Sequence, residues 1–148
     1  MLGSRLRAAF TFACLAACAG CGGGDGGAPS SGASFAGAPY AVVASDSGRL
    51  RVELRTASGE APERGTNEVE LTVLDASSSA PEDGLVLDVV PWMVAMGHGT
   101  SVVPSITPRG GGRYVITNLA LYMPGRWELR TRLADGQDDH ASPTLDVP

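Results

Sequence analysis

Lysine is absent from this chain, and cysteine is confined to its first 21 residues. The three cysteines are Cys14, Cys18 and Cys21. The part that follows can therefore form neither a disulfide bond nor a thiolate metal site, and it has no cysteine nucleophile. Histidine is also scarce, with two residues in the whole sequence. A catalytic histidine needs a nucleophile and an orienting acid beside it, and no such set stands out, so we expect no enzyme.

The basic residues are eleven arginines, and they face sixteen acidic residues. Removing Arg5 and Arg7, which lie in a predicted signal peptide, leaves nine arginines against sixteen acids, a net charge near −7. An acidic domain gains nothing from the release of phosphate counterions. We therefore expect no nucleic-acid partner.

The first residues are typical of a secretory signal. After the two arginines comes an apolar run over residues 8–17, which is too short to cross a bilayer, since a spanning helix needs ~20 apolar residues. The run ends in Leu-Ala-Ala-Cys at residues 15–18, which resembles the lipobox of bacterial lipoproteins. We predict a signal peptide over residues 1–17 and lipidation of Cys18. The alternatives are lipidation of Cys21 and an ordinary cleaved signal without a lipid.

Lipid chains on Cys18 would hold the protein at a membrane, facing the periplasm of a bacterial cell envelope. Ala19 follows, and by resemblance to the sorting rule of enteric bacteria the absence of an acidic residue there favours the outer membrane. Residues 22–39 are rich in Gly, Ser, Ala and Pro and lack apolar periodicity. Together with the lipid cysteine, residues 18–39 are predicted to form a flexible tether.

Apolar and polar residues alternate with a period of two through the remaining chain, residues 40–148. The alternation is clear at residues 49–55, 67–74 and 126–133, and further short strands are expected at residues 85–90, 102–107, 114–117 and 144–147. Segments rich in Gly, Asp, Ser and Pro separate them, and no apolar pattern follows helical spacing for three turns. We predict one monomeric all-β domain, an immunoglobulin-like antiparallel β-sandwich of about seven strands.

Several short motifs resemble the YtkA-like domain, a small bacterial extracytoplasmic β-domain. They are Met-Gly-His-Gly at residues 96–99, Gly-Arg-Tyr at 112–114, Met-Pro-Gly-Arg-Trp at 123–127, and Gly65 with Asn67 at the entry to a strand. Two departures are the arginine inserted between Gly and Tyr, and a proline, Pro91, one or two places early. The resemblance implies a sandwich fold and a location outside the cytoplasm. It also implies kinship with domains of copper-handling and oxidase-assembly proteins.

The segment around the Met-Gly-His-Gly motif contains candidate soft ligands. Thioether sulfur selects Cu(I), and imidazole suits copper in either oxidation state. We therefore predict a copper site formed by Met93, Met96 and His98, with Met123 from a neighbouring loop and Trp92 as an apolar cover.

A structural interpretation remains open for the same residues. Methionine is a flexible core filler, and the two glycines beside His98 would serve a tight turn. The domain would then be a non-catalytic structural or protein-interaction module that docks an envelope partner. The second histidine, His140, follows two aspartates, a composition typical of a solvated turn.

Overall fold

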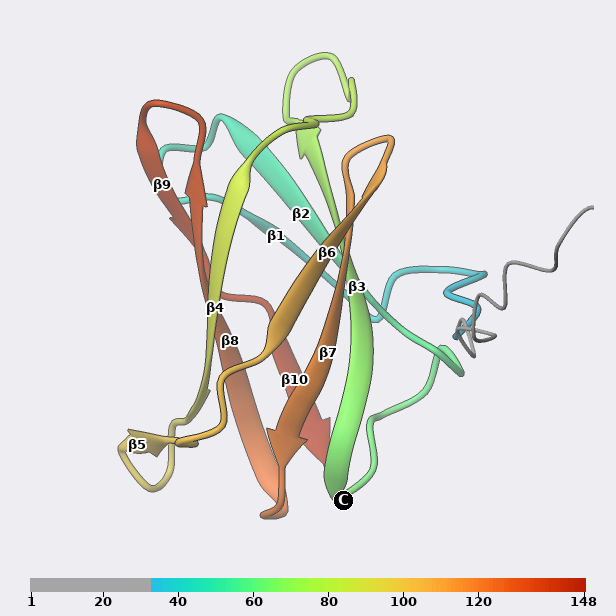
Figure 1. Cartoon of the computed structure of the whole chain (residues 1–148), viewed down its shortest axis with the longest axis vertical. Coiled ribbons are helices and arrows are strands. Elements are labelled where there is room, and N and C mark those ends of the chain that lie inside the picture. Colours follow the sequence, from blue (N-terminus) through green and yellow to red (C-terminus); the bar gives the residue numbers. More distant parts are fainter. Residues whose placement is uncertain (1–32) are drawn as a thin grey trace, which may run out of the picture. The chain divides into compact units, whose positions relative to one another are not determined.

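The structure, a computed structural model, describes residues 33–148. The predicted signal peptide, Cys18 and Cys21, and the tether up to residue 32 lie outside the described residues. Within this part of the chain there are ten β-strands and no helix, and hence no helix that could cross a membrane (Figure 1). The strands are β1 (Ala41–Ala44), β2 (Leu50–Thr56), β3 (Gly65–Asp75), β4 (Val86–Met93), β5 (His98–Gly99), β6 (Ser105–Gly110), β7 (Arg113–Leu121), β8 (Gly125–Ala134), β9 (Asp138–Ala141) and β10 (Thr144–Val147).

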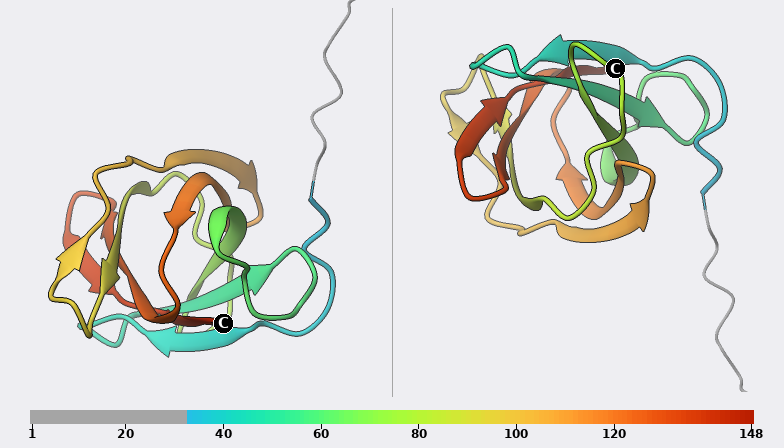
Figure 2. Two further views of the ribbon diagram at one scale, coloured as in Figure 1. Left: turned by 90° about the horizontal axis from the view of Figure 1, so that it is seen from below. Right: turned by 90° about the horizontal axis from the view of Figure 1, so that it is seen from above.

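The strands form two antiparallel sheets. The first has the order β1-β2-β3-β7-β6, and the second has the order β10-β8-β4-β5, with β9 also paired to β8. Strands β10 and β9 lie along successive halves of β8, because β10 pairs with Gly125–Glu128 and β9 with Thr131–Ala134. Viewed from either end, the two sheets curve around a shared interior (Figure 2). The predicted all-β sandwich is confirmed.

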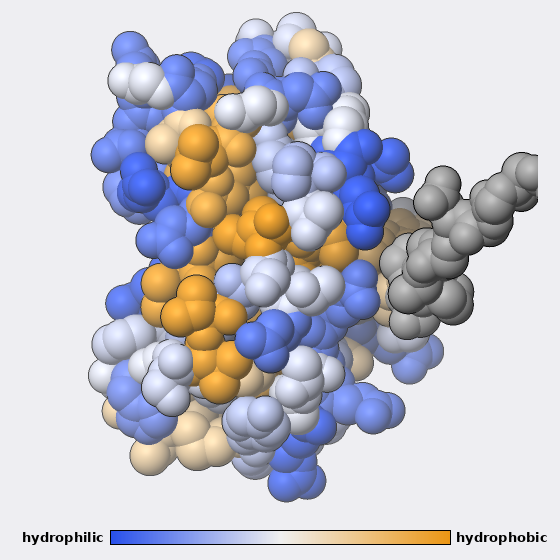
Figure 3. Space-filling model, viewed as in Figure 1, coloured by the Kyte–Doolittle hydropathy of each residue, from blue (hydrophilic) through white to orange (hydrophobic). Residues whose placement is uncertain are grey.

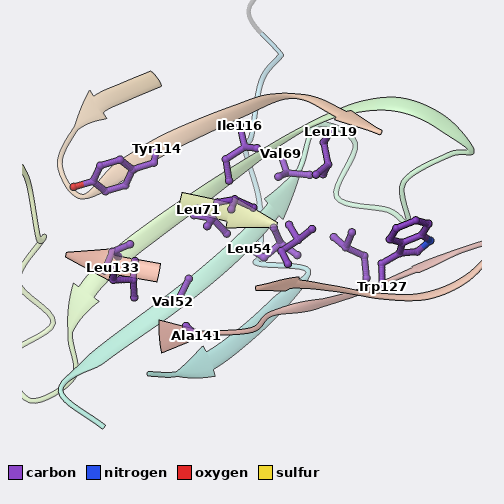
Figure 4. Packing of buried hydrophobic residues seen from close by; sticks show 14 of the residues in the cluster. Val52, Leu54, Val69, Leu71, Tyr114, Ile116, Leu119, Trp127, Leu133 and Ala141 are labelled. Atoms are coloured by element: carbon purple, nitrogen blue, oxygen red, sulfur yellow. The ribbon is translucent and has the colours of Figure 1, made fainter. Parts of the chain in front are cut away.

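The core is built from the inward faces of the alternating strands. In β2, Leu50, Val52 and Leu54 are fully buried, and the residues between them are partly exposed. Strand β8 contributes Trp127, Leu129 and Leu133 in the same way, and Figure 4 shows such side chains meeting between the sheets. Full burial of one such side chain stabilises the fold by about 1.5–3 kcal/mol.

Each of the seven predicted strands has a counterpart, although the one expected at residues 102–107 begins only at Ser105 and runs to Gly110, and the structure adds three short strands, β1, β5 and β9. The prediction was wrong at residues 138–140, which form part of β9 and not a solvated turn. Asp139 points inward there, 5% exposed, and its carboxylate accepts hydrogen bonds from the Ser47 amide at 3.1 Å and the Ser47 hydroxyl at 2.5 Å. Short strands such as these take their stability from neighbouring strands, which a local pattern does not contain.

Groups of loops at the two ends of the sandwich differ in charge. One end, hereafter the charged end, carries the β1–β2, β3–β4, β6–β7 and β8–β9 connections, which include Asp46, Arg49, Glu82, Asp83 and Asp135. At the other end, the β4–β5, β5–β6 and β7–β8 connections form a part without charged residues, hereafter the uncharged end (Figure 1). These three connections lie within residues 89–108 and 114–125, two stretches that contain no Asp, Glu, Arg or Lys. The β2–β3 connection, which does contain charged residues, lies beside them, because Gly65 at the start of β3 pairs with Leu121 at the end of β7.

Candidate metal site at the β4–β5 hairpin

The Met/His segment forms a tight hairpin at the uncharged end. Strand β4 ends at Met93, residues 94–97 form the loop, and β5 begins at His98 directly opposite Met93. The Met93 carbonyl accepts hydrogen bonds from the amides of Met96 at 3.2 Å and Gly97 at 3.0 Å. Gly97 has a φ of 67°, a left-handed conformation that glycine adopts without steric cost. The turn therefore depends on this glycine.

The second glycine of the motif is needed for close packing. A Cβ on Gly99 would lie 2.6 Å from the Pro91 carbonyl oxygen, so β5 can approach β4 only if this residue has no side chain. The glycines on both sides of His98 thus have structural roles, as the structural interpretation expected.

The four predicted ligands divide into two pairs. Met93 is 6% exposed and belongs to the core, and Met123 is partly buried and packs against the same core. Met96 is 57% exposed in the loop, and the His98 side chain is also exposed. Solvent therefore reaches Met96 and His98 freely, whereas Met93 and Met123 are largely removed from it.

Strand pairing still brings the members of this set into one region. Met93 lies directly opposite His98 on one side and Trp127 on the other, and directly opposite residues project from the same face of a sheet. The Trp127 indole donates a hydrogen bond of 3.0 Å to the Met123 carbonyl, which fixes the β7–β8 turn beside this row. His98, Met93 and Trp127 thus form a continuous row across the inner face of the second sheet.

The hydrogen bond made by His98 determines which ring nitrogen is free. Its Nδ1 lies 3.0 Å from the Gly99 carbonyl oxygen. A carbonyl oxygen only accepts, so Nδ1 donates its proton. In the neutral imidazole the lone pair is then on Nε2, the arrangement that prepares a histidine to bind a metal ion.

Trp92 does not cover this region, and that prediction was wrong. Successive residues of a strand point to opposite faces, so Trp92 lies on the outer face while Met93 points inward. It pairs with Glu128, and the Arg130 guanidinium carbon lies 4.2 Å from the centroid of its ring. The tryptophan on the inner face is Trp127, 2% exposed. The alternation in residues 126–133 places it inward, but its position next to Met93 comes from the pairing of β4 with β8.

The second histidine has no metal-binding partners. His140 is exposed on β9 and pairs with Arg132, while the preceding Asp139 points inward to Ser47. Burial alone would raise the pKa of Asp139, but hydrogen bonds from Ser47, Ser45 and the His140 amide outweigh it and lower the pKa to about 2. Across residues 33–148, no group of three or more His, Cys, Asp and Glu side chains could hold a metal ion.

The fold defines the class of protein: residues 33–148 form a small two-sheet β-sandwich domain without helices. The model of the YtkA-like family matches residues 45–132, more than half of the 148-residue chain, and the chain belongs to this family. No curated protein matches the chain. No solved structure matches it either.

The motif residues differ in what they do within this fold. Tyr114 and Trp127 are buried, and the Tyr114 hydroxyl donates to the Glu82 carbonyl at 2.9 Å and accepts from the Leu85 amide at 3.1 Å. Packing and hydrogen bonding account for both aromatic residues. Met96 and His98, in contrast, are exposed, and nothing in the packing of the core calls for a thioether or an imidazole there.

Proposed function

We propose that this protein is an envelope lipoprotein whose YtkA-like domain binds copper as Cu(I) at the β4–β5 hairpin, in a handling or buffering role. Met96 and His98 are the proposed ligands. A thioether and an imidazole form a soft and borderline donor pair that suits Cu(I). Lipidation of Cys18 would keep the domain at the membrane.

The observation that carries the proposal is the hydrogen bond from His98 Nδ1 to the Gly99 carbonyl, at 3.0 Å. It favours the tautomer with a free lone pair on Nε2, and Met96, two residues earlier in the sequence, has an exposed thioether. Because the pair is exposed, we expect a copper ion to exchange readily with other carriers. This favours transfer or buffering over permanent storage.

The core methionines have a secondary part in this proposal. Met93 lies directly opposite His98, and its terminal methyl group comes close to Gly125, since a Cβ built there would be 3.1 Å away. Met93 thereby supports the base of the hairpin. We expect Met93 and Met123 to affect copper binding through the position of the loop, and less than the two exposed ligands do.

The test is a competition titration for Cu(I) with a chromogenic chelator under reducing conditions. The wild-type domain should withdraw one equivalent of copper, and a variant with Met96→Ala and His98→Ala should withdraw none. Two controls are matched to this variant: His140→Ala removes the other histidine, at the charged end, and Met123→Leu replaces a core methionine by an apolar residue of similar size. His140→Ala should bind as the wild type does, and Met123→Leu, which preserves the packing beside the loop, should still withdraw one equivalent of copper.

Equal withdrawal by wild type and double variant, or none by either, would rule out the hairpin as a copper site. The function left would then be the alternative, a non-catalytic structural or protein-interaction module without a metal. Loss of binding in His140→Ala would instead place the site at the opposite end.

A further inference from the structure

The three methionines in residues 33–148 differ in their access to solvent. Met96 is 57% exposed, whereas Met93 is 6% exposed and Met123 packs against the core. A Cβ built on Gly125 would lie 3.1 Å from the terminal methyl group of Met93, so this thioether also has a close neighbour across the β4–β8 pair. Since oxidation of a methionine requires access to its sulfur, a small oxidant in solution should reach Met96 first.

The remaining exposed apolar surface offers an oxidant no comparable group. In residues 33–148 the large hydrophobic side chains with substantial exposure are Met96, Tyr122 and five valines. Two of these valines, Val86 and Val90, lie on β4, and Figure 3 shows an apolar band along the face that carries β4 and β6. Thiols and thioethers are the side-chain groups that dilute peroxide oxidises, and residues 33–148 contain no cysteine. Met96 is therefore the preferred target on this surface.

The hairpin can accept an oxygen atom on Met96 without loss of the fold. Met96 contributes its main chain to the turn, because its amide donates to the Met93 carbonyl at 3.2 Å, and its side chain is exposed. Methionine sulfoxide is polar, so it disrupts a packed core but is readily hydrated at an exposed position. Oxidation of Met96 should leave the sandwich intact, whereas oxidation of Met93 would disturb the core.

The same oxygen atom would remove the soft ligand of the proposed copper site. Thioether sulfur selects Cu(I), whereas the oxygen of a sulfoxide is a hard donor. His98 would then be left as the only proposed ligand. Copper held by the pair Met96 and His98 should therefore be released when Met96 is oxidised.

We propose that Met96 is a modification site at which a peroxide oxidises the thioether to the sulfoxide and thereby releases copper from the hairpin. This inference rests on the copper site of the proposed function. The sulfur attacks one oxygen of hydrogen peroxide, so an S–O bond forms and the O–O bond breaks. The sulfur is oxidised and the peroxide is reduced, because its second oxygen leaves with the electron pair of the broken bond and takes the proton of the transferred oxygen to give water. A dithiol reverses the change: it is oxidised to a disulfide, and the sulfoxide oxygen leaves as water.

The test uses metal-free residues 33–148, which contain the complete core and lie within one compact unit, Gly32–Pro148. Dilute hydrogen peroxide is added and is removed before each measurement. Peptide mass spectrometry should find one oxygen atom at Met96 before any appears at Met93 or Met123. A Cu(I) titration of this product should show loss of the copper equivalent that the untreated domain withdraws. Methionine sulfoxide reductases with a dithiol should remove the oxygen atom and restore the copper equivalent.

Two variants separate the change at Met96 from other effects of peroxide. Met96→Gln places a polar side chain of similar size where the sulfoxide would be, and it should withdraw no copper. The matched control is Val94→Gln, which places the same side chain at another exposed position of the same loop and should still withdraw one equivalent. The near-ultraviolet circular dichroism of buried Trp127 should be unchanged in both variants and in the oxidised domain.

Oxygen at Met93 or Met123 no later than at Met96 would overturn the inference. An oxidised domain that keeps its copper equivalent while Met96 alone carries oxygen would overturn it too. Copper binding that stays lost after the oxygen atom has been removed would also contradict it, since other damage would then be the cause. An untreated domain that withdraws no copper is a distinct result, because it refutes the proposed function and with it the release of copper, while the mass spectra still decide whether Met96 is the modification site.

Discussion

The two ends of the sandwich are closed by different kinds of interaction. At the charged end, side chains bond the loops to one another across long stretches of sequence. Asp83 accepts hydrogen bonds from the amides of Gly111 and Gly112, and Asp139 accepts them from Ser47, 92 residues away. At the uncharged end, main-chain carbonyls are the acceptors instead: the Met93 carbonyl closes the hairpin, and the side chains of Trp127 and Asn118 donate to the carbonyls of Met123 and Val103.

This difference indicates which side chains the fold itself uses and which are left available for binding. The carboxylates of Asp83, Asp135 and Asp139 at the charged end are engaged by donors of their own chain, so they hold the fold together. Asp75 is an extreme case, because hydrogen bonds from the hydroxyls and amides of Ser77 and Ser78 hold its pKa well below the usual range. The loops of the uncharged end leave Met96, His98 and several apolar side chains facing outward. These carboxylates of the charged end are thus committed to the fold, whereas Met96 and His98 of the uncharged end remain available for binding.

The largest effect we predict is from Trp127→Ala, which removes the aromatic core of the uncharged end and the hydrogen bond to the Met123 carbonyl. We expect a loss of about 3–5 kcal/mol in the free energy of unfolding. Chemical denaturation measures it. Tyr122→Ala, in the neighbouring turn but at an exposed position, should change stability by less than about 0.5 kcal/mol. Similar losses in both variants would contradict the packing described for this end.

The next effect contrasts two adjacent glycines at the charged end. Gly111 and Gly112 both have positive φ, 67° and 69°, but a Cβ on Gly112 would lie 2.3 Å from the Val73 carbonyl oxygen, whereas one on Gly111 would meet nothing within 4 Å. Gly111→Ala should cost about 1–2 kcal/mol, the price of the left-handed conformation. Gly112→Ala should cost clearly more, because the main chain must also shift. Thermal unfolding of the two variants compares them, and equal midpoints would disprove the close approach.

A third prediction concerns the pH dependence of the charged end. Asp139→Asn should destabilise the domain by roughly 1–3 kcal/mol at neutral pH, since the amide cannot accept all the hydrogen bonds that the carboxylate receives. The folded-state pKa of Asp139 is lowered to about 2, whereas an unfolded aspartate titrates near pH 4. Its contribution is therefore complete above about pH 4 and is lost as the pH falls towards 2.

Urea denaturation of wild type and Asp139→Asn between pH 7 and pH 2 tests this. The difference between the two proteins should be constant down to about pH 4 and shrink below it. A difference that stays constant to pH 2 would mean that the Asp139 carboxylate is not responsible. Ser101→Ala, at an exposed position of the β5–β6 connection in a stretch without acidic residues, is a suitable control for general acid effects.

The smallest effect should come from the stacked pair on the outer face. Arg130 lies over Trp92 and also bonds half-buried Glu128, so Arg130→Ala should cost about 0.5–1 kcal/mol. The Trp92 environment should change although stability hardly does. Fluorescence measured in a Trp127→Phe background isolates the signal of Trp92. An unchanged spectrum would show that the stacking does not persist in solution.

The sequence predicted most of the sandwich because its strands alternate strictly. Residues 49–55 and 126–133 place one apolar face inward whatever their partners are, so β2 and β8 could be located from the pattern. The short strands β5 and β9 could not, since two and four residues carry too little periodicity. They form because each can pair with a longer neighbouring strand, β5 with β4 and β9 with β8.

The candidate site was predicted in part. The order Met-x-x-Met-x-His placed three soft or borderline ligands within six residues, and glycines near the histidine indicated a turn. Burial then separated them, with Met93 inside and Met96 outside, and the alternation of β4 placed Trp92 on the wrong face to cover them. Neither result follows from spacing, because both depend on which face of β4 packs against the first sheet.

By itself, the sequence determined the class of fold, the family motifs, the excess of acids and the two stretches without charge. Only the tertiary structure brought the loops within these two stretches, residues 94–97, 100–104 and 122–124, to the same end, through the pairing of β4 with β8 and the turn that joins β7 to β8. The physical reason is that alternation is a local property that one strand can satisfy alone. The neighbours of each loop are fixed by strand pairing between residues far apart in the chain.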